Sequence, residues 1–232
     1  MILSVADVSA GYGSTPVLRD IRFSQAGGEV LGIIGHNGMG KTTLLRTLAG
    51  LLKTGTGSIT FDGQRIDALP AYRRSALGIG YVAQGDRGFP GLTVAESLKL
   101  ATLAKGRTVS MTIDRVIDLF PGLANLLARR SETLSGGERQ LLAIARAVIR
   151  TPQFLLLDEL TEGVQPSIVE NLAERLRSLH SELKMTMLIV DQELAFVASL
   201  ATRILVMQKG RLVRELGADA LADPDVLGGF GG

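Results

Sequence analysis

The segment from Gly35 to Thr42, GHNGMGKT, has the residue types and spacing to bind a phosphate chain. It fits the pattern GxxxxGK[ST], it follows the apolar run 30–34, and leucines at helical spacing come directly after it. Glycines at these places let backbone N–H groups converge on an anion, and the following helix N-terminus adds positive potential. A glycine-rich turn with a chance lysine is the alternative, and the strand–turn–helix context disfavours it. We therefore predict a nucleotide-binding loop.

The lysine and the two threonines at the end of this loop are expected to have separate tasks. Lys41 is predicted to reach the β- and γ-phosphates, Thr42 to bind Mg²⁺, and Thr43 to lie near the α-phosphate. The residues assigned to the nucleotide in this segment are Gly35, His36, Asn37, Gly38, Met39, Gly40, Lys41, Thr42 and Thr43. A nucleoside triphosphate and Mg²⁺ are thus the predicted ligands of this segment.

Two carboxylates, Asp158 and Glu159, follow the apolar run 154–157. At the end of a buried strand, such a pair can place one side chain beside a metal ion and the next beside an attacking water. Asp158 is therefore predicted to bind Mg²⁺, and Glu159 to act as general base or to orient the water. A strand that ends in a solvated acidic turn is the alternative, and the nucleotide-binding loop makes it the weaker one.

A third candidate segment, residues 134–138, reads LSGGE and precedes an apolar helical pattern. Ser-x-x-Glu at such a place is a capping box, so Ser135 and Glu138 have a purely structural explanation. The glycines between them, Gly136 and Gly137, nevertheless expose backbone N–H groups at a helix N-terminus. The segment is therefore also a candidate for a second phosphate-binding site on the same chain.

The elements that must position these residues follow from the hydrophobic periodicity. Strand-like alternation fills residues 2–8, 17–23 and 59–61, and Asp62-Gly63 is predicted to turn a hairpin. Further along, helical patterns separated by Pro and Gly predict an inserted helical arm. Beyond the arm, helices and strands alternate, which favours a mainly parallel sheet. The predicted elements are helices 94–103 and 113–120 in the arm, then helix 138–149, strand 154–157, helix 167–183, strand 185–190, helix 193–200 and strands 204–207 and 211–215.

The composition limits the class of protein. A chain of 232 residues with 46% hydrophobic residues is long enough for one domain with a sizeable core. No window contains the ~18 uninterrupted apolar residues of a spanning helix, and the N-terminus lacks a basic region followed by an apolar run, so the chain is expected to be neither membrane-spanning nor secreted. The absence of cysteine excludes disulfides and thiolate metal sites. With 25 basic against 23 acidic residues and 4% aromatics, no nucleic-acid partner is expected.

The motifs, in this order, resemble those of the ATP-binding subunits of ABC transporters, whose signature reads LSGGQ or LSGGE; the resemblance extends over residues 2–218. It implies an α/β fold: a P-loop NTPase core with a mainly parallel sheet, an N-terminal antiparallel β edge and an inserted helical subdomain. The single domain would have a core of residues 1–84 and 149–220, a helical arm of about 85–148 and a flexible tail, 221–232. The implied reaction is hydrolysis of ATP to ADP and phosphate.

The resemblance also implies a dimer, in which the signature of one subunit covers the γ-phosphate held by the other. Tyr12 stands where the family stacks an aromatic ring on adenine, although an aromatic in an early strand can also belong to the core or the surface. Gln84, after the strand 79–82, matches the glutamine that touches Mg²⁺ and senses the membrane subunits. These two residues are therefore assigned to the nucleotide, and Gln84 also to the metal.

Three positions depart from the usual family pattern. Leu160 stands where a proline commonly follows the Asp-Glu pair, which is expected to make the turn that aims Glu159 less rigid. Gln165 replaces an aspartate that faces the dimer partner, and Gln192 replaces the switch histidine. A glutamine can donate a hydrogen bond to a γ-phosphate but cannot take up a proton. The catalytic assignment is therefore Lys41, Glu159 and Gln192, with Glu159 as the base.

Within the family, three phrases resemble the branched-chain amino acid and urea importers, and the urea type most: GHNGMGKTTLLRTLAGLL, GIGYVAQGDRGFPGLTVAESL and LDELTEGVQPSIV. This resemblance implies a peripheral subunit at the cytoplasmic face of the inner (plasma) membrane. Its partners would be membrane permease subunits and a second ABC ATPase subunit, identical or paralogous. Urea or a short amide is the expected solute, and branched-chain amino acids are the alternative. A soluble ABC ATPase that acts on DNA or the ribosome is a further alternative, but the sequence lacks the coiled-coil insertion or second cassette typical of those proteins.

Overall fold

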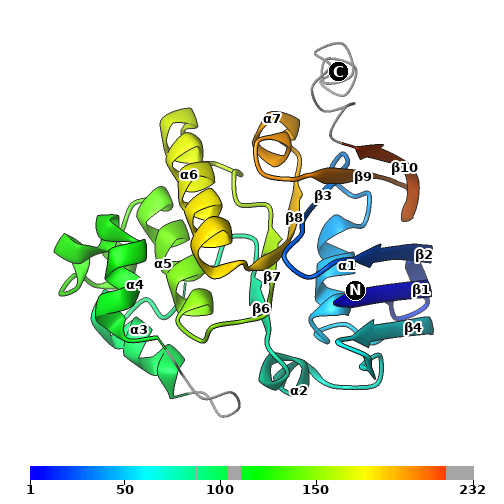
Figure 1. Ribbon diagram of the computed structural model, residues 1–232, viewed down its shortest axis with the longest axis horizontal. Coiled ribbons are helices and arrows are strands. Elements are labelled where there is room, and N and C mark those ends of the chain that lie inside the picture. Colours follow the sequence, from blue (N-terminus) through cyan, green and yellow to red (C-terminus); the bar gives the residue numbers. More distant parts are fainter. Residues whose placement is uncertain (87, 104–110, 218–232) are drawn as a thin grey trace.

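The structure, a computed structural model, describes residues 1–86, 88–103 and 111–217. Figure 1 shows a helical arm of α3, α4 and α5 on one side, an antiparallel sheet on the other, and parallel strands between them. The strands are β1 (Leu3–Tyr12), β2 (Thr15–Gln25), β3 (Val30–Ile34), β4 (Thr56–Phe61), β5 (Gln64–Arg65), β6 (Ile79–Val82), β7 (Phe154–Asp158), β8 (Thr186–Asp191), β9 (Arg203–Gln208) and β10 (Arg211–Gly217). The helices are α1 (Lys41–Leu48), α2 (Ala71–Ala76), α3 (Val94–Thr102), α4 (Ile113–Leu119), α5 (Gly136–Val148), α6 (Pro166–Leu183) and α7 (Leu194–Ala198), with 3-10 turns η1 (Pro121–Leu126) and η2 (Ser131–Thr133).

The central sheet has six strands in the order β10-β9-β3-β8-β7-β6, and all neighbours pair in parallel except β9 with β10. The side chains of β7 alternate between two buried clusters: Leu155 and Leu157 face one, and Leu156 faces the other. The predicted mainly parallel sheet is confirmed. Because β3, β7 and β8 run in parallel, the residues that follow them meet at one edge of the sheet.

The second sheet is antiparallel, in the order β2-β1-β4-β5, and α1 lies between it and the central sheet. Leu44, Leu45 and Leu48 of α1 are buried in the cluster that both sheets share. β4 and β5 form a hairpin through Asp62 and Gly63, whose φ angles of +47° and +77° suit a turn with two left-handed residues. The predicted antiparallel edge and the hairpin are confirmed.

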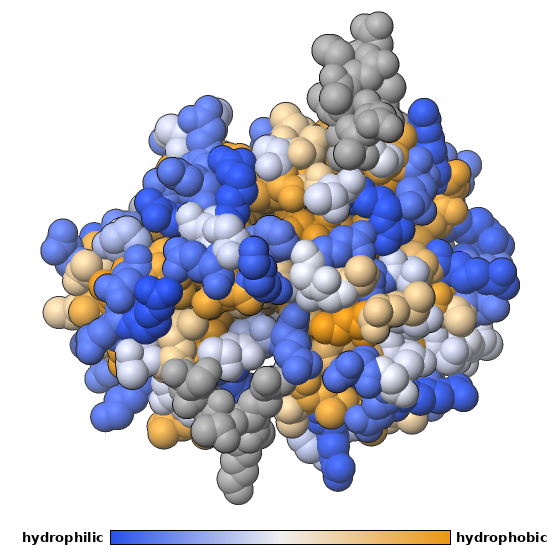
Figure 2. Space-filling model, in the orientation of Figure 1, coloured by the Kyte–Doolittle hydropathy of each residue, from blue (hydrophilic) through white to orange (hydrophobic). Residues whose placement is uncertain are grey.

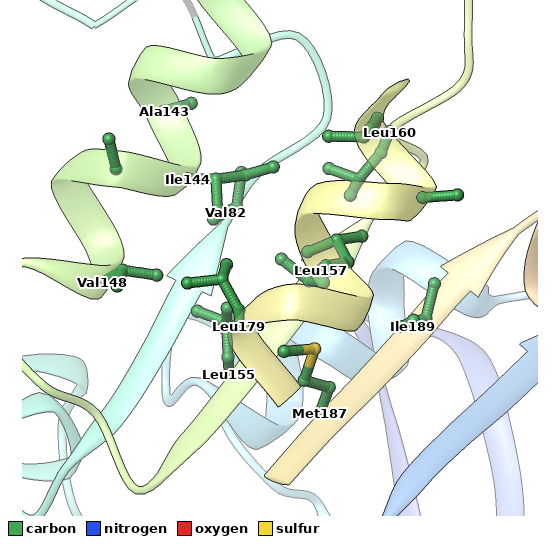
Figure 3. Close-up of a cluster of buried hydrophobic side chains, with 14 of the residues drawn as sticks. Val82, Ala143, Ile144, Val148, Leu155, Leu157, Leu160, Leu179, Met187 and Ile189 are labelled. Atoms are coloured by element: carbon green, nitrogen blue, oxygen red, sulfur yellow. The ribbon is translucent and has the colours of Figure 1, made fainter. Parts of the chain in front are cut away.

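Helix α5 joins the helical arm to the central sheet, because it packs against α3 on one side and β6 on the other. Figure 3 shows Ala143, Ile144 and Val148 of α5 facing side chains of the sheet and Leu179 of α6. The helices expected in the arm are confirmed as α3 and α4, each within about a residue of its expected ends. The division into core and arm stays a prediction, and the predicted flexible tail, 221–232, lies outside the described residues.

The sequence analysis missed α2, a helix of six residues that is held by one buried arginine. The guanidinium of Arg74 donates to the carbonyl oxygens of Thr47 at 2.8 Å and Leu48 at 2.9 Å, at the C-terminal end of α1. It also donates to the carbonyls of Leu69 and Asp67. Burial lowers the pKa of Arg74. A cation at this end of α1 complements the helix dipole, so α2 helps to fix the helix that follows the phosphate loop.

The surface is mixed in character. Figure 2 shows hydrophobic residues mostly near the middle of this face, while the margins are mainly hydrophilic. Among the described helices, none combines the length and the apolar character that a membrane crossing requires.

Candidate active site

The phosphate loop connects β3 with α1 and ends at a helix N-terminus whose N-cap residue, Gly40, has no side chain to cap it. Gly38 and Gly40 have φ angles of +78° and +104°, in the left-handed region that glycine enters without steric cost. The first turn of α1 has no acidic residue, so nothing in that turn offsets the partial positive charge of the helix N-terminus. The loop therefore fits an anion, as the sequence predicts.

The turn between β9 and β10 packs against the phosphate loop. The N–H group of Gly210 donates to the carbonyl oxygen of Met39 at 3.0 Å. A Cβ atom on Gly210 would lie 1.8 Å from the carbonyl oxygen of Val17, and one on Gly35 would lie 2.4 Å from that of Met207. Backbone segments thus approach too closely at positions 35 and 210 for any side chain. This packing fixes the path of the loop.

Lys41, the first residue of α1, turns its ammonium group back toward the loop. Its Nζ atom donates to the carbonyl oxygens of Gly35 at 2.7 Å and His36 at 3.2 Å. The same atom lies 3.0 Å from Oε1 of Glu159, and both side chains are almost completely buried. The predicted phosphate-binding lysine and the predicted base are therefore direct neighbours.

The carboxylate of Asp158 is fully buried and held by two hydroxyl groups. Thr42 donates to Oδ1 at 3.0 Å, and Tyr81 donates to Oδ2 at 2.8 Å. Burial raises the pKa of Asp158, and the two hydrogen bonds act in the opposite direction. Burial, followed by the charge of Asp158, also raises the pKa of Tyr81. Tyr81 thus stays neutral and donates to Oδ2 of Asp158, while Oδ1 of Asp158 lies beside Thr42.

The donor set at Asp158 suits Mg²⁺ bound together with phosphate oxygens. Mg²⁺ prefers oxygen ligands and usually keeps one or two carboxylates from the protein, the other positions going to water and phosphate. Here one carboxylate and the hydroxyl of Thr42 lie next to each other at the start of α1. Within the described ranges, no group of three or more His, Cys, Asp or Glu forms a metal cage of its own. The site is therefore shaped for a metal that arrives with a phosphate chain.

Gln84 reaches the same edge of the sheet from the other side. Its Nε2 atom donates to Oε2 of Glu159 at 2.7 Å and to Oε2 of Glu162 at 2.5 Å. The structure thus joins Gln84 to the predicted base, at the start of the segment that leads from the core into the arm. Its predicted contact with Mg²⁺ stays a prediction. Glu162, which the sequence analysis did not select, is a second carboxylate within reach of the same amide.

The turn that carries Glu159 has an unusual backbone. Glu159 has a φ angle of +44°, and its N–H group donates to the carbonyl oxygen of Val190 at 2.8 Å. The next residue, Leu160, is 1% exposed and packs into the hydrophobic cluster that Leu155 and Leu157 of β7 also face (Figure 3). A proline at position 160 would restrict Glu159 to extended backbone, which its positive φ does not match. Leu160 thus packs its side chain into the core next to Glu159, and the expected lower rigidity of the turn stays a prediction.

Gln192 and Tyr12 are less closely tied to this constellation. Gln192 follows β8 and is exposed, and its backbone N–H group donates to Asp191 at 2.7 Å. Tyr12 ends β1 with 47% of its surface exposed, and Arg46 of α1 donates to its hydroxyl at 3.4 Å. No hydrogen bond in the described part of the chain joins either side chain to Lys41 or Glu159. Their predicted roles remain predictions.

The signature segment caps α5 in the way its sequence predicts. Ser135 accepts a hydrogen bond from the N–H group of Glu138 at 3.3 Å, and Glu138 accepts one from the N–H group of Ser135 at 2.7 Å. A Cβ atom on Gly137 would lie 2.5 Å from Ile168 of α6, whereas one on Gly136 would meet no atom of the described residues within 4 Å. Packing against Ile168 therefore explains why residue 137 is a glycine. Packing among the described residues does not explain why residue 136 is one.

The signature and the phosphate loop belong to different parts of the fold. Helix α5 lies with the arm, and α1 lies between the two sheets (Figure 1). Over the described ranges, no hydrogen bond or ion pair links residues 134–138 to residues 35–43. The chain thus brings the predicted phosphate and metal ligands together at one place, and the segment predicted to be a second anion-binding site lies apart from them.

Besides Glu162, two further residues at this end of the sheet had escaped the sequence analysis, Tyr81 and Asp191. Tyr81 sits among apolar residues in β6, and nothing in the local pattern distinguishes it from a core aromatic. Asp191 had a signal that could have been used: the runs LLLDE and LIVDQ both end a buried strand with Asp followed by Glu or Gln. Since neighbouring parallel strands end at the same edge, the second run should have been considered together with the first.

A phosphate loop ahead of a helix, a buried acidic strand end and a central parallel sheet define a P-loop NTPase. The sequence profile described as ABC transporter matches residues 18–162. The chain belongs to the ABC transporter family, as one of its ATP-hydrolysing cassettes.

Individual relatives and solved structures agree with this assignment. The probable branched-chain amino acid transport ATP-binding protein LivF of Archaeoglobus fulgidus is 35% identical, over 91% of this chain and 90% of its own length. The high-affinity branched-chain amino acid transport ATP-binding protein BraG of Pseudomonas aeruginosa is 37% identical, over 97% of both chains. The ADP conformation of MJ1267, an ATP-binding cassette of an ABC transporter, has a TM-score of 0.84 at 25% identity, covering 98% of this chain and 97% of that one.

Proposed function

We propose that this chain is the energy-coupling ATPase of a membrane importer. Its ATPase part is carried by the joint placement of Lys41 and Thr42 with Asp158 and Glu159 at one edge of the central sheet. The relatives named above are transport ATP-binding proteins of nearly the same length. Peripheral binding at the cytoplasmic face of the inner membrane follows from this role.

The arrangement supports a distinct task for each residue during hydrolysis. Lys41 binds the β- and γ-phosphates, and the N–H groups of the phosphate loop surround them. Thr42 and Asp158 would hold Mg²⁺, which would neutralise charge on the phosphate oxygens. Glu159, which directly follows β7 and lies beside Lys41, orients the attacking water and accepts its proton. Gln192 donates a hydrogen bond to the γ-phosphate.

Two copies, or this chain and a paralogue, are proposed to complete each other's sites. Gly136 opens the N-terminus of α5 to the outside, and Ser135 presents its hydroxyl there. No contact with a described residue requires glycine at position 136. A γ-phosphate brought by a partner cassette would use the exposed N–H groups.

A groove between the end of α1, α2, α3 and α5 is proposed as the place where a permease subunit docks. Its volume is about 560 Å³, and exposed apolar side chains line it, among them Leu51, Phe89 and Leu100. The guanidinium of Arg146 lies 5.4 Å from the ring centre of Phe89 and 3.3 Å from Asp86. A short amphipathic helix can fill such a groove with its apolar face.

Two observations disagree about which solute the importer transports. The named relatives favour branched-chain amino acids. The sequence phrases, LDELTEGVQPSIV above all, favour urea or a short amide. We place branched-chain amino acids first, because the relatives cover almost the whole chain, and keep urea as the second candidate.

Uptake in cells that lack this chain tests both solutes. Radiolabelled leucine and urea are supplied at trace concentration, and the cells carry either the wild-type chain or Lys41→Ala. If only the wild-type chain restores leucine uptake, branched-chain amino acids are supported as the solute. If only the wild-type chain restores urea uptake, urea is supported. If neither changes, and the chain does not co-purify with a permease from membranes, the importer role is wrong while the ATPase assignment stands.

A further inference from the structure

Asp191, the last residue of β8, is a carboxylate with 1% exposure and a network of its own. One of its oxygens, Oδ1, accepts hydrogen bonds from the hydroxyl of Thr161 at 2.6 Å and from the N–H groups of Gln192 at 2.7 Å and Glu193 at 3.2 Å. The other, Oδ2, accepts one from the N–H group of Thr161 at 3.1 Å. Across the described residues, no ion pair involves Asp191, so hydrogen bonds alone satisfy the carboxylate.

The four donors come from two different loops of the site. Thr161 lies two residues after Glu159, in the turn that follows β7. Gln192 opens the turn that follows β8. The N–H group of Glu159 also donates to the carbonyl oxygen of Val190, so the first turn crosses the end of β8. Asp191 therefore ties the loop that carries the proposed base to the loop that carries the proposed γ-phosphate contact.

A neutral side chain cannot satisfy these four donors as well as the carboxylate does. Three of them are backbone N–H groups, and these cannot reverse direction as a hydroxyl can. An asparagine of the same shape would turn its own NH₂ group toward at least one of them. The two loops would then lose a shared acceptor while the hydrophobic packing around position 191 stays the same.

We propose that Asp191 is a positioning residue for ATP hydrolysis, which fixes Glu159 and Gln192 relative to each other through Thr161 and the N–H group of Gln192. The inference rests on the roles proposed for Glu159 and Gln192 and does not depend on the transported solute. A displacement of about 1 Å at a reacting group can cost on the order of 100-fold in rate. Such a displacement would affect the chemical step rather than the binding of ATP.

The test compares Asp191→Asn, Thr161→Val and Thr161→Ser in the full chain together with its partner subunits. We expect Asp191→Asn and Thr161→Val to lower kcat about tenfold or more. We expect the Kd for ATP, measured by calorimetry, and the KM to change by about threefold at most. Thr161→Ser, which keeps the hydroxyl, should recover most of the rate.

A matched control lies at the opposite end of the same strand. Thr186 is buried, and its hydroxyl accepts a hydrogen bond from the N–H group of Gly28 at 2.9 Å. Thr186→Val should therefore lower the melting temperature about as much as Thr161→Val but leave kcat unchanged. A loss of kcat in both variants would mean that the strand end matters only for stability, and this would overturn the inference.

Double variants test whether the residues act as one unit. The variant Asp191→Asn/Thr161→Val should be no slower than the slower single variant, because both changes break the same link. Losses that multiply would contradict the inference. If Glu159→Gln and Gln192→Ala are slow while Asp191→Asn is fully active, the inference fails and the proposed roles stand. Full activity of Glu159→Gln would refute the roles themselves.

Discussion

The ammonium nitrogen of Lys41 lies 3.0 Å from Oε1 of Glu159, so the residue proposed to bind the γ-phosphate and the proposed base form a buried ion pair. The two residues come from the helix after β3 and the turn after β7. Charges so deeply buried depend strongly on each other, because removal of one leaves the other without compensation. Variants of this pair should therefore change stability as well as catalysis.

Lys41→Ala should abolish ATP turnover and also lower the free energy of unfolding. The variant removes the cation from the phosphates and leaves Glu159 buried without its partner, a change that typically costs about 3–5 kcal/mol. Turnover is measured as phosphate release, and stability by urea unfolding. Normal hydrolysis in this variant would refute the assignment of the site.

Glu159→Gln should bind ATP but hydrolyse it about 100-fold or more slowly, because the amide cannot accept the proton of the attacking water. It also removes a negative charge next to Lys41, which leaves the ammonium free for the phosphates. We expect an ATP-bound dimer that survives gel filtration when both partner cassettes are present. A monomer with ATP bound under those conditions would contradict the dimer model.

Asp158→Asn should stabilise the protein while it abolishes Mg²⁺-dependent hydrolysis. Burial, the main cause, raises the folded-state pKa of Asp158 above its ordinary value of 3.8, so ionisation of this carboxyl costs stability. This loss of stability is absent well below pH 3.8, the ordinary pKa. It grows as the pH rises from there to the raised folded-state pKa, and it is complete at higher pH. Tyr81 and Thr42 can both rotate their hydroxyls to suit an amide.

Thermal unfolding of Asp158→Asn without nucleotide measures this effect. The variant should melt a few degrees above the wild type at pH 7, at about 2–4 °C per kcal/mol for a chain of this length. The difference should shrink as the pH falls toward 4. Asp118→Asn, at a side chain that is 68% exposed, serves as the control and should show no such trend. A wild type that is more stable than Asp158→Asn at pH 7 would contradict the burial argument.

Gly210→Ala should weaken ATP binding, and Gly63→Ala should not. The two glycines have nearly the same φ angle, +76° and +77°, so both variants bear a similar backbone strain of about 1–2 kcal/mol. Only at position 210 would the new Cβ atom collide with another backbone, that of Val17, and displace the donor to Met39. Calorimetry with ATP should give a Kd several-fold higher for Gly210→Ala alone. Equal Kd values would mean that the turn does not position the loop.

Ser135→Arg should leave the affinity of the isolated chain for ATP nearly unchanged, because its own phosphate loop is intact. Turnover of the assembled dimer should fall at least tenfold, since the arginine blocks the site of the partner. Ser135→Ala is the control for the lost helix cap, which by itself costs about 1 kcal/mol of stability. It should lose less turnover than Ser135→Arg. If Ser135→Arg weakened ATP binding to the monomer, the signature would act within its own chain.

The local motifs could be predicted because contiguous residues define them. The phosphate loop needs only the strand, turn and helix of residues 30–48, and the cap of α5 needs only Ser135 and Glu138. Period-two and period-3.6 patterns also predicted most strands and helices within one or two residues. Helix α2 escaped because it has six residues, and its anchor is a buried arginine rather than an apolar face.

The sequence by itself determined which chemistry this protein performs, since the residue types and spacings that bind phosphate, metal and water lie within short segments. Only the tertiary structure decided which distant residues share a hydrogen bond: Tyr81 with Asp158, Thr161 with Asp191, and Gly210 with Met39. These contacts join residues that are about 30 to 170 positions apart, and they depend on strand order and register. Hydrophobic patterns specify which face of a strand is buried, but the order of strands in a sheet arises when all elements pack together.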